Sequence, residues 1–576
     1  MLQLLRYIRG YGKQCVLGPL FKLLEATFEL LIPLVVAQIV DVGILRGDSG
    51  YIVKMCLVMC ALGIIGLVCA VTAQYFAAKA AVGMATRVRH AALQHILGLS
   101  YSQMDKLGTS TLITRLTSDI NQIQNGVNLT LRLLLRSPFV VFGAMVMAFT
   151  IDFESAMVFA GTIPVLCVVV FGIMLLSMPI YKRVQSRLDG VTSATRQNLA
   201  GVRVLRAFNM EQAQIQNFEN ANQALYSQQM VSSRISSLLN PVTYVIINLA
   251  VVILVRIGAV KVDSGILTQG HVIALYNYMS QILVELVKMA NLIITMTKAF
   301  ACGNRVQKIL EIREDQKDGT TVPDGDSRGL VEFRNVTMQY HAGGEPSLEN
   351  VSFTAQPGQT VGIIGGTGSG KTSLVNLIPR FYDAAQGQVL VDGVNVLDYP
   401  KAELRKRIGI VPQKAVLFKG TIRQNLLWGN ENATEQQLLS ALETAQALEI
   451  VQNKSGGLDA EVEQGGTNFS GGQRQRLTIA RALVRDPEIL ILDDSASALD
   501  YATDAALRKA IAQIPDAPTT FIVSQRVSSV RLADTILVLD DGNLVGMGTH
   551  EELLNACPVY REICALQLKE EVSSNG

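Results

Sequence analysis

The sequence of 576 residues is poor in charge: 17% of its residues are charged, whereas 49% are hydrophobic. This balance is unusual for a wholly soluble protein, so part of the chain is expected to lie in lipid. The length is several times that of a typical single domain, which excludes one small domain and predicts at least two.

An excess of charge of one sign is also absent. The 50 basic and 48 acidic residues give a formal net charge of +2. No basic tract stands out, so nucleic acid is not expected as a partner. The amino terminus is basic and precedes an apolar stretch, but no small-residue cleavage site follows, which argues against a cleaved signal peptide.

Paired cysteines are lacking as well. The eight cysteines are scattered, and Cys56, Cys60, Cys69 and Cys167 lie inside apolar runs. Their spacing fits neither a zinc site nor a secreted disulfide scaffold. They are expected to act as small buried hydrophobic residues.

Long apolar runs, in contrast, are abundant. The charge-free runs 55–78, 155–181 and 235–255 reach the roughly 20 residues that a helix needs to cross a bilayer. Three further runs contain charges: 16–40 with Lys22 and Glu25, 131–151 with Arg132 and Arg136, and 271–296 with Glu285 and Lys288. The sequence therefore predicts six membrane-spanning helices.

Charge placement predicts the orientation of these helices. The stretches between spans two and three and between spans four and five are long and basic, which makes them cytoplasmic by the positive-inside rule, as are both termini. Within the spans, Glu285 is expected to pair with Lys288 and Glu25 with Lys22. Arg132 and Arg136 are expected to extend to the lipid headgroups. Whether Glu285 and Lys288 also contact a substrate stays open.

The composition changes after about residue 310. Residues 311–330 combine charge, proline and glycine and form the predicted linker between a membrane domain (1–310) and a soluble domain (331–569), with a tail at 570–576. Short β runs alternate with helical stretches beyond the linker: VEFRNV, TVGIIG, QVLVDG, RIGIVPQ, EILILDD, TTFIVSQ and TILVLDDG. The second domain is therefore predicted to be α/β with a partly parallel sheet.

A glycine-rich motif follows the run TVGII. It consists of Gly365, Gly366, Thr367, Gly368, Ser369, Gly370, Lys371 and Thr372, and a helical stretch follows it. This order is that of a P-loop, in which backbone amides cradle phosphate, Lys371 reaches the β and γ oxygens, and the Thr372 hydroxyl ligates Mg²⁺. The strand EILILDD ends in Asp493, which suits a second carboxylate on the magnesium side. ATP and Mg²⁺ are thus the expected cofactors.

The motif FSGGQ, residues 469–473, lies between these two segments, and here the whole chain resembles the ATP-binding cassette (ABC) family. The resemblance implies an exporter-type half-transporter: an all-α six-helix transmembrane domain followed by an α/β P-loop nucleotide-binding domain, an ATPase coupled to transport. It further implies that Tyr340 stacks on adenine, that Gln413 is the Q-loop residue beside the metal, and that Asp500 belongs to the D-loop. The segments 109–118 and 198–211 resemble the coupling helices that rest on the nucleotide-binding domains.

The signature motif implies a dimer. In the family, Ser470, Gly471, Gly472 and Gln473 close on the nucleotide held by the partner subunit, so two ATP sites need two chains. A second half-transporter is therefore an expected partner, together with membrane lipid and a hydrophobic or amphipathic small molecule, the latter by family analogy alone. A bacterial cytoplasmic membrane is the implied location.

Two residues depart from the family pattern. Asp494 stands where the family usually has Glu as the base that orients the attacking water, and Gln525 stands where the switch-region His is expected. The combination resembles one half of the heterodimeric bacterial multidrug exporters, with a site that binds ATP but hydrolyses it poorly. The alternatives are a homodimeric lipid or drug flippase and an ATP-gated regulatory membrane protein.

Overall fold

The structure is a computed structural model that describes all residues except 1, 324–327, 342 and 575–576, and only the backbone of 568–574. The chain forms two compact units. Met1–Leu97 and Gly108–Ile312 make up the helical unit, while Gly98–Leu107 and Arg313–Gly576 make up the nucleotide-binding unit. Parts of the predicted linker (324–327) and of the predicted tail (575–576) lie outside the described residues.

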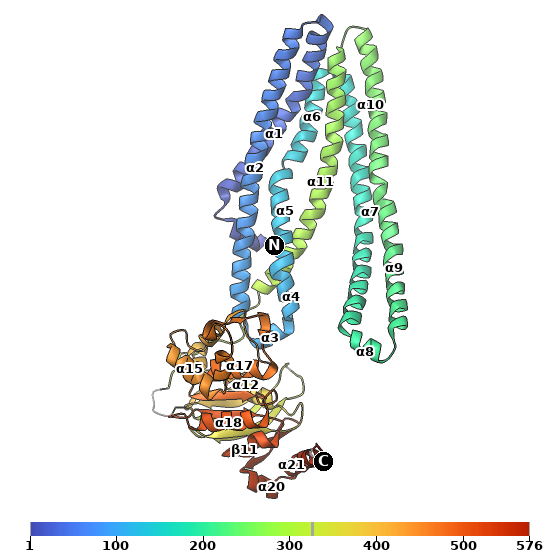
Figure 1. The fold of residues 1–576 in the computed structure, drawn as a ribbon. Coiled ribbons are helices and arrows are strands. Elements are labelled where there is room, and N and C mark those ends of the chain that lie inside the picture. The colour runs from blue at the N-terminus through green and yellow to red at the C-terminus, as the bar shows by residue number, and fades with distance from the viewer. Residues whose placement is uncertain (1, 324–327, 342, 575–576) are drawn as a thin grey trace. The chain divides into compact units, whose positions relative to one another are not determined.

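Long helices build the helical unit (Figure 1). Its elements are η1 (Leu2–Ile8), α1 (Gly12–Gln38), η2 (Ile39–Ile44), α2 (Ser49–Gly98), α4 (Thr109–Thr114), η3 (Arg115–Asp119), α5 (Ile120–Leu133), α6 (Arg136–Ile151), α7 (Phe153–Ala200), α8 (Val202–Ala207), α9 (Glu211–Ser237), α10 (Leu239–Asp263) and α11 (Gln269–Leu310).

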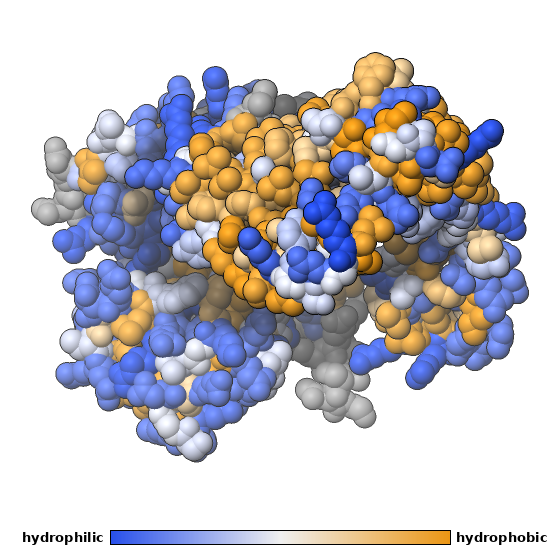
Figure 2. All heavy atoms as spheres, turned by 90° about the horizontal axis from the view of Figure 1, so that it is seen from above, coloured by the Kyte–Doolittle hydropathy of each residue, from blue (hydrophilic) through white to orange (hydrophobic). Residues whose placement is uncertain are grey.

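Six helical segments among the described residues are long and apolar enough to cross a membrane, which confirms the predicted count. They are longer than the predicted spans because the helices continue into the basic stretches; Phe153–Ala200, for example, has 48 residues. In the most apolar window of Ser49–Gly98, only 6% of the residues are buried. Hydrophobic residues cover much of the surface that the long helices present in Figure 2. Such a surface is suited to lipid rather than water.

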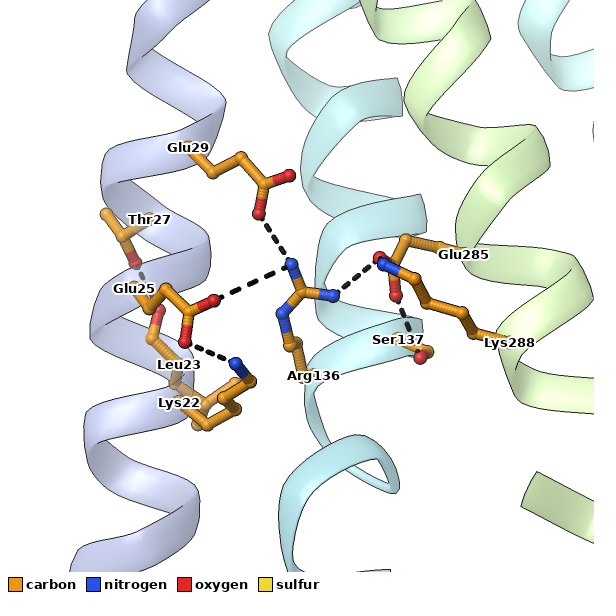
Figure 3. A network of polar contacts seen from close by, with 9 residues as sticks. All are labelled: Lys22, Leu23, Glu25, Thr27, Glu29, Arg136, Ser137, Glu285 and Lys288. Carbon is orange, nitrogen blue, oxygen red and sulfur yellow. Dashed lines mark hydrogen bonds and ion pairs between the residues drawn. The ribbon is translucent and has the colours of Figure 1, made fainter. Parts of the chain in front are cut away.

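Several charged residues inside these helices are paired (Figure 3). Lys22 contacts Glu25 at 2.5 Å and Lys288 contacts Glu285 at 2.8 Å, so both predicted pairs are confirmed. The prediction for Arg136 was wrong, because this residue is 5% exposed and binds Glu285 and Glu29 instead of reaching headgroups. A guanidinium that has no access to water is stable only beside carboxylates.

The nucleotide-binding unit is an α/β structure, as predicted. Its helices are α3 (Tyr101–Leu107), α12 (Lys371–Leu377), α13 (Lys401–Lys406), α14 (Ile422–Leu426), α15 (Glu435–Thr444), α16 (Leu448–Gln452), η4 (Gly457–Asp459), η5 (Gln464–Gly466), α17 (Gly471–Leu483), α18 (Tyr501–Ala512), α19 (Val527–Val530), α20 (His550–Ala556) and α21 (Pro558–Ser574).

Its strands are β1 (Val331–Met338), β2 (Leu348–Ala355), β3 (Thr360–Ile364), β4 (Gln386–Val391), β5 (Val394–Asn395), β6 (Ile408–Val411), β7 (Gly420–Thr421), β8 (Glu461–Val462), β9 (Ile489–Asp493), β10 (Thr519–Val523), β11 (Thr535–Asp540) and β12 (Asn543–Gly548). All seven predicted β runs form strands. The sequence reading missed β2, β5, β7, β8 and β12.

The central sheet positions the candidate site. Its order is β12-β11-β3-β10-β9-β6, and all neighbours are parallel except the antiparallel pair β11 and β12. Both faces of this sheet carry buried clusters of aliphatic residues, which explains the continuous apolar runs in its strands. The carboxyl ends of parallel strands meet at one edge, so the segments after β3, β9 and β10 come together there.

The predicted first coupling segment, 109–118, was misplaced. Its residues form α4 and most of η3 in the helical unit, whereas α3 is the segment that packs within the nucleotide-binding unit. The ring of Tyr101 stacks on Phe381 at 4.4 Å, and Tyr382 donates a hydrogen bond to Asp105 at 2.6 Å. Aromatic side chains make this contact, and the segment 109–118 contains none.

Candidate functional site

Backbone shape at the end of β3 builds the glycine-rich loop. Gly370 has a φ of +95°, in the left-handed region that glycine adopts without strain, and it directly precedes α12. A Cβ on Gly365 would collide with the carbonyl oxygen of Leu539. These two positions therefore require glycine for the turn from strand to helix.

Lys371 is buried inside this loop, with 8% exposure. Its ammonium donates hydrogen bonds to the carbonyl oxygens of Gly365 (2.9 Å) and Gly366 (2.5 Å) and to the Ser369 hydroxyl (3.3 Å). Burial lowers the pKa of Lys371, an effect that Asp494 and Asp493 oppose. The three groups that accept hydrogen bonds from Lys371 are neutral, which leaves its positive charge available to an anion.

Thr372 and Asp493 lie next to each other. The Thr372 hydroxyl donates a hydrogen bond to Asp493 Oδ1 at 3.0 Å. Burial raises the pKa of Asp493, and the Thr372 bond acts in the opposite direction. A hydroxyl and a carboxylate fit Mg²⁺, which takes oxygen ligands and shares them with phosphate and water. Among the described residues, no group of three His, Cys, Asp or Glu side chains could hold a metal ion by itself.

A cavity of about 310 Å³ opens beside these residues. It brings together eleven of the predicted site residues: Tyr340, Thr367, Gly368, Ser369, Gly370, Lys371, Thr372, Gln413, Asp493, Asp494 and Gln525. Ser347, Ser373, Val523 and Ser524 also line the cavity and were missed. Ser373 and Ser524 adjoin the predicted residues Thr372 and Gln525 in the sequence, whereas only tertiary structure brings Ser347 to the cavity.

Asp494 lines this cavity as well. Its φ is +46°, and the Gln413 amide donates a long hydrogen bond of 3.4 Å to its Oδ2. Gln525 is exposed at the same cavity, directly after β10 and Ser524. The two residues that depart from the family pattern thus face one space together with Lys371.

The predicted signature residues do not line this cavity. Ser470 is the exposed N-cap of α17, where its hydroxyl accepts a hydrogen bond from the Gln473 backbone amide at 3.3 Å in a capping box. Asp500 caps α18 by accepting from the Thr503 amide at 2.9 Å, a bond that lowers its pKa. Within this chain both side chains therefore stabilise helix starts.

A row of aromatic rings connects the cavity with α3. The Tyr340 hydroxyl lies 2.9 Å from the Ser373 hydroxyl, and its ring meets Tyr382 edge-on at 5.1 Å. Tyr382 in turn lies 6.3 Å from Tyr101 of α3. Burial and the nearby Asp105 raise the pKa of Tyr382. Sequence reasoning found only Tyr340, because about 280 residues separate Tyr101 from Tyr382.

The segment after β10 is also held from outside the predicted motifs. Gln567 of α21 donates from its amide nitrogen to the Gln525 carbonyl oxygen at 2.7 Å, and its amide oxygen accepts from the Val527 amide at 2.8 Å. Tyr560 fixes the same helix, fully buried with its hydroxyl 2.7 Å from His550 Nδ1. No sequence signal marks Gln567.

An apolar helical unit and a nucleotide-binding unit with a P-loop in one chain define an ATP-driven membrane transporter. Residues 15–286 match the family model described as the ABC transporter transmembrane region, and residues 348–497 match the model described as ABC transporter. An uncharacterized ABC transporter ATP-binding protein of Mycobacterium tuberculosis is 37% identical over 575 residues, covering 98% of both chains. The chain therefore belongs to the ABC transporter family.

More distant proteins agree with this assignment. The ATP-dependent lipid A-core flippase of Escherichia coli is 28% identical over 546 residues, which cover 95% of this chain and 94% of the flippase. A solved bacterial Atm1-family ABC exporter with ATP bound has the same fold, with a TM-score of 0.79, 23% identity, and coverage of 96% of this chain and 98% of that one. The protein is an exporter-type half-transporter of the bacterial inner membrane, with a cytoplasmic ATPase domain.

Proposed function

We propose that this chain is one half of an exporter that moves hydrophobic or amphipathic compounds out across the cytoplasmic membrane, and that its own ATP site binds nucleotide but hydrolyses it slowly. One observation carries the proposal: Asp494 and Gln525 line the same cavity as Lys371 and Thr372. The groups that bind phosphate are complete, whereas the groups that activate water are altered.

The predicted lining residues have specific roles in this proposal. Tyr340 stacks on adenine, the loop amides and Lys371 bind the phosphates, and Thr372, Gln413 and Asp493 supply oxygen ligands for Mg²⁺. When bound, the ion would neutralise charge that develops on the phosphate oxygens. The hydrogen bond between Thr372 and Asp493 already holds two of these ligands side by side.

The altered residues explain slow hydrolysis. The Asp494 side chain is one methylene shorter than Glu, so its carboxylate reaches less far toward an attacking water, and a displacement of about 1 Å can cost roughly 100-fold in rate. Gln525 can donate a hydrogen bond to a phosphate but cannot carry a proton or a positive charge. ATP at this site would then be held longer than it takes the partner's site to turn over.

The partner completes both sites. Ser470, Gly471 and Gly472 lie outside this chain's own cavity, and Ser470 is exposed, which suits contact with ATP held by a second half-transporter. A partner with an intact base and switch residue would give one fast and one slow site. A homodimeric lipid flippase is the second candidate, because two relatives are named ATP-dependent lipid A-core flippases. An ATP-gated regulatory role is the third.

Two substitutions separate these schemes. The assembly is purified from its own membranes through a tag on this chain, and steady-state ATP hydrolysis is measured. Asp494→Asn should retain most of the turnover, since a badly placed base contributes little. Ser470→Arg should abolish most of it, because a large side chain then faces phosphate in the competent site. Equal losses from both changes would favour a homodimer with two equivalent slow sites.

The chain offers matched controls for both changes. Asp541 also has a positive φ, +44°, and lies outside the cavity. Asp541→Asn therefore tests whether replacing a carboxylate by an amide at a positive φ changes hydrolysis by itself. Thr434 caps α15 with the same capping box as Ser470, so Thr434→Arg tests the loss of a helix cap alone. Both controls should hydrolyse ATP like the unmodified protein. Substrate-stimulated hydrolysis and uptake into inverted vesicles then distinguish an exporter from an ATP-gated regulator.

A further inference from the structure

A buried network of charges joins three helices of the helical unit. The Arg136 guanidinium of α6 contacts Glu285 of α11 at 2.5 Å and Glu29 of α1 at 2.6 Å, while Glu25 of α1 lies 4.0 Å away. Ser137 donates a further hydrogen bond to Glu285 at 2.9 Å. Figure 3 shows Arg136 in the middle, with the α1 carboxylates on one side and Glu285 and Lys288 on the other.

The charges in this network balance. Three basic side chains (Lys22, Arg136 and Lys288) face three acidic ones (Glu25, Glu29 and Glu285), and every member has an ion-pair partner. The inner pair of Arg136 and Glu285 is almost fully buried. Glu29 and Lys288 are different, because their side chains are 37% and 43% exposed. Among the described residues, each of these two has one ion-pair contact, made to a member of the inner pair.

Both outer residues open into one cavity. It has a volume of about 400 Å³ and is lined by residues of α1 and α11. Ile32, Val36 and Val284 supply apolar walls. Gln281 lines it too, and its side-chain oxygen is buried without a hydrogen-bond partner among the described residues. Such an acceptor costs free energy unless a ligand or water satisfies it.

We propose that this cavity binds the headgroup of a zwitterionic amphiphile, with the cationic group on Glu29, the anionic group on Lys288 and the start of the hydrocarbon chain against the apolar wall. The inference names the substrate class for the proposed exporter and rests on that function. Arg136 and Glu285 keep each other as partners when the ligand engages the two outer residues. No charge in the site is left without a counter-charge.

Charge balance is what selects this class of ligand. A ligand with a net charge would add one uncompensated charge to a neutral network surrounded by lipid, where such a charge is costly. A ligand without charges would leave the outer ion pairs in place but gain nothing from them. Only separated charges of both signs use Glu29 and Lys288 together, since these residues lie on opposite sides of Arg136 (Figure 3).

Three probes with the same tail test the proposal: hexadecylphosphocholine (zwitterionic), hexadecyltrimethylammonium (cationic) and hexadecyl sulfate (anionic). Their binding to the purified full-length assembly is compared by native mass spectrometry in a neutral maltoside detergent. The unmodified protein should prefer the zwitterion by roughly tenfold over either charged probe, the scale of one charge-assisted contact. A phosphatidylethanolamine with two acyl chains, added in the same assay, distinguishes a membrane lipid from a single-chain compound.

Two variants should shift this preference in opposite directions. Glu29→Gln should weaken the zwitterion and favour the sulfate, whereas Lys288→Gln should weaken the zwitterion and favour the ammonium probe. Lys261→Gln removes another ion-paired lysine of this unit, one that binds Asp152 at 2.8 Å outside the cavity, and should leave the order of probes unchanged.

Equal effects of Glu29→Gln and Lys288→Gln on all three probes, or a preference of the unmodified protein for a singly charged probe, would overturn the proposed site. ATP-driven export together with either result would leave the exporter function standing. An assembly that prefers the zwitterion but shows no transport would instead contradict the proposed function. Monodisperse elution during gel filtration verifies that each variant is folded.

Discussion

Two buried cations show how differently the two units use a positive charge. Arg136 in the helical unit and Lys371 in the nucleotide-binding unit are 5% and 8% exposed. Arg136 is neutralised by ion pairs with Glu285 and Glu29, whereas the hydrogen bonds of Lys371 go to two carbonyl oxygens and a hydroxyl. Arg136, whose charge is paired with carboxylates, holds helices together. Lys371, whose hydrogen-bond partners are neutral, can bind an anion.

Removing the charge of Arg136 should have the largest effect on stability. Arg136→Met leaves Glu285 and Glu29 without their shared partner, and breaking a buried ion pair from one side costs about 3–5 kcal/mol. We expect a lower thermal unfolding temperature and a lower yield of folded protein in detergent.

A second substitution sharpens this test. Arg136→Met combined with Glu285→Met should recover much of the lost stability, because it removes the buried unpaired carboxylate of Glu285. Glu29 and Lys288 also lose their partners, but their side chains are 37% and 43% exposed and can be hydrated. Arg132→Met makes the same change at a half-buried arginine four residues earlier, near the end of α5, and should cost much less. A loss as large for Arg132→Met as for Arg136→Met would show that the carboxylates around Arg136 are not what makes it important.

Removing the charge of Lys371 should instead weaken nucleotide binding. Lys371→Ala takes away the charge that faces the phosphates, and charge-assisted contacts of this kind are worth about tenfold to a hundredfold in affinity. Labelling of this chain by a photoreactive ATP analogue should fall accordingly. Thermal stability without nucleotide should change little, since Lys371 forms no ion pair among the described residues. Unchanged labelling would contradict the proposed role of the loop.

The same contrast explains what the sequence could and could not predict. Lys371, Thr372 and Asp493 belong to segments whose order alone identifies them, and parallel strands bring those segments to one sheet edge. Arg136 and Glu285 are 149 residues apart, and no local pattern links them. A position near the end of a span made Arg136 look like a headgroup contact. Only helix packing decides which carboxylate it meets.

A smaller effect is expected at the carboxylate beside Lys371. Burial raises the pKa of Asp493 above its usual value of 3.8, so its ionised form destabilises the folded state at neutral pH. Asp493→Asn should therefore stabilise the unit without nucleotide at pH 7, because the variant has no charge to bury. The gain should shrink as the pH falls through the folded pKa, and vanish below 3.8, where Asp493 is protonated in both states.

Thermal unfolding at several pH values measures this difference. Asp516→Asn, at another aspartate with a positive φ that lies outside the cavity, provides the control. A gain for Asp493→Asn that grows toward acidic pH would contradict the raised pKa. With Mg²⁺ and ATP present, Asp493→Asn should lower the stability instead, because the variant lacks the carboxylate proposed to ligate Mg²⁺.

The smallest effect is expected from a neutral group that touches neither cation. The Gln567 side chain bridges the backbone on both sides of Arg526, so it fixes the segment that carries Gln525 into the cavity. Gln567→Ala removes two hydrogen bonds, each worth about 1 kcal/mol. Release of an ATP analogue from this chain's site should become a few-fold faster. If the partner's site sets the kcat of the pair, as we propose, kcat should stay nearly constant. Gln567→Glu retains the acceptor for Val527 but loses the donor to Gln525, so it should accelerate release as much as Gln567→Ala if the Gln525 contact is decisive.

Gln513→Ala, at an exposed glutamine that ends α18, should leave release unchanged. Equal losses of kcat and of nucleotide retention in both Gln567 variants would assign this residue to general stability rather than to positioning Gln525.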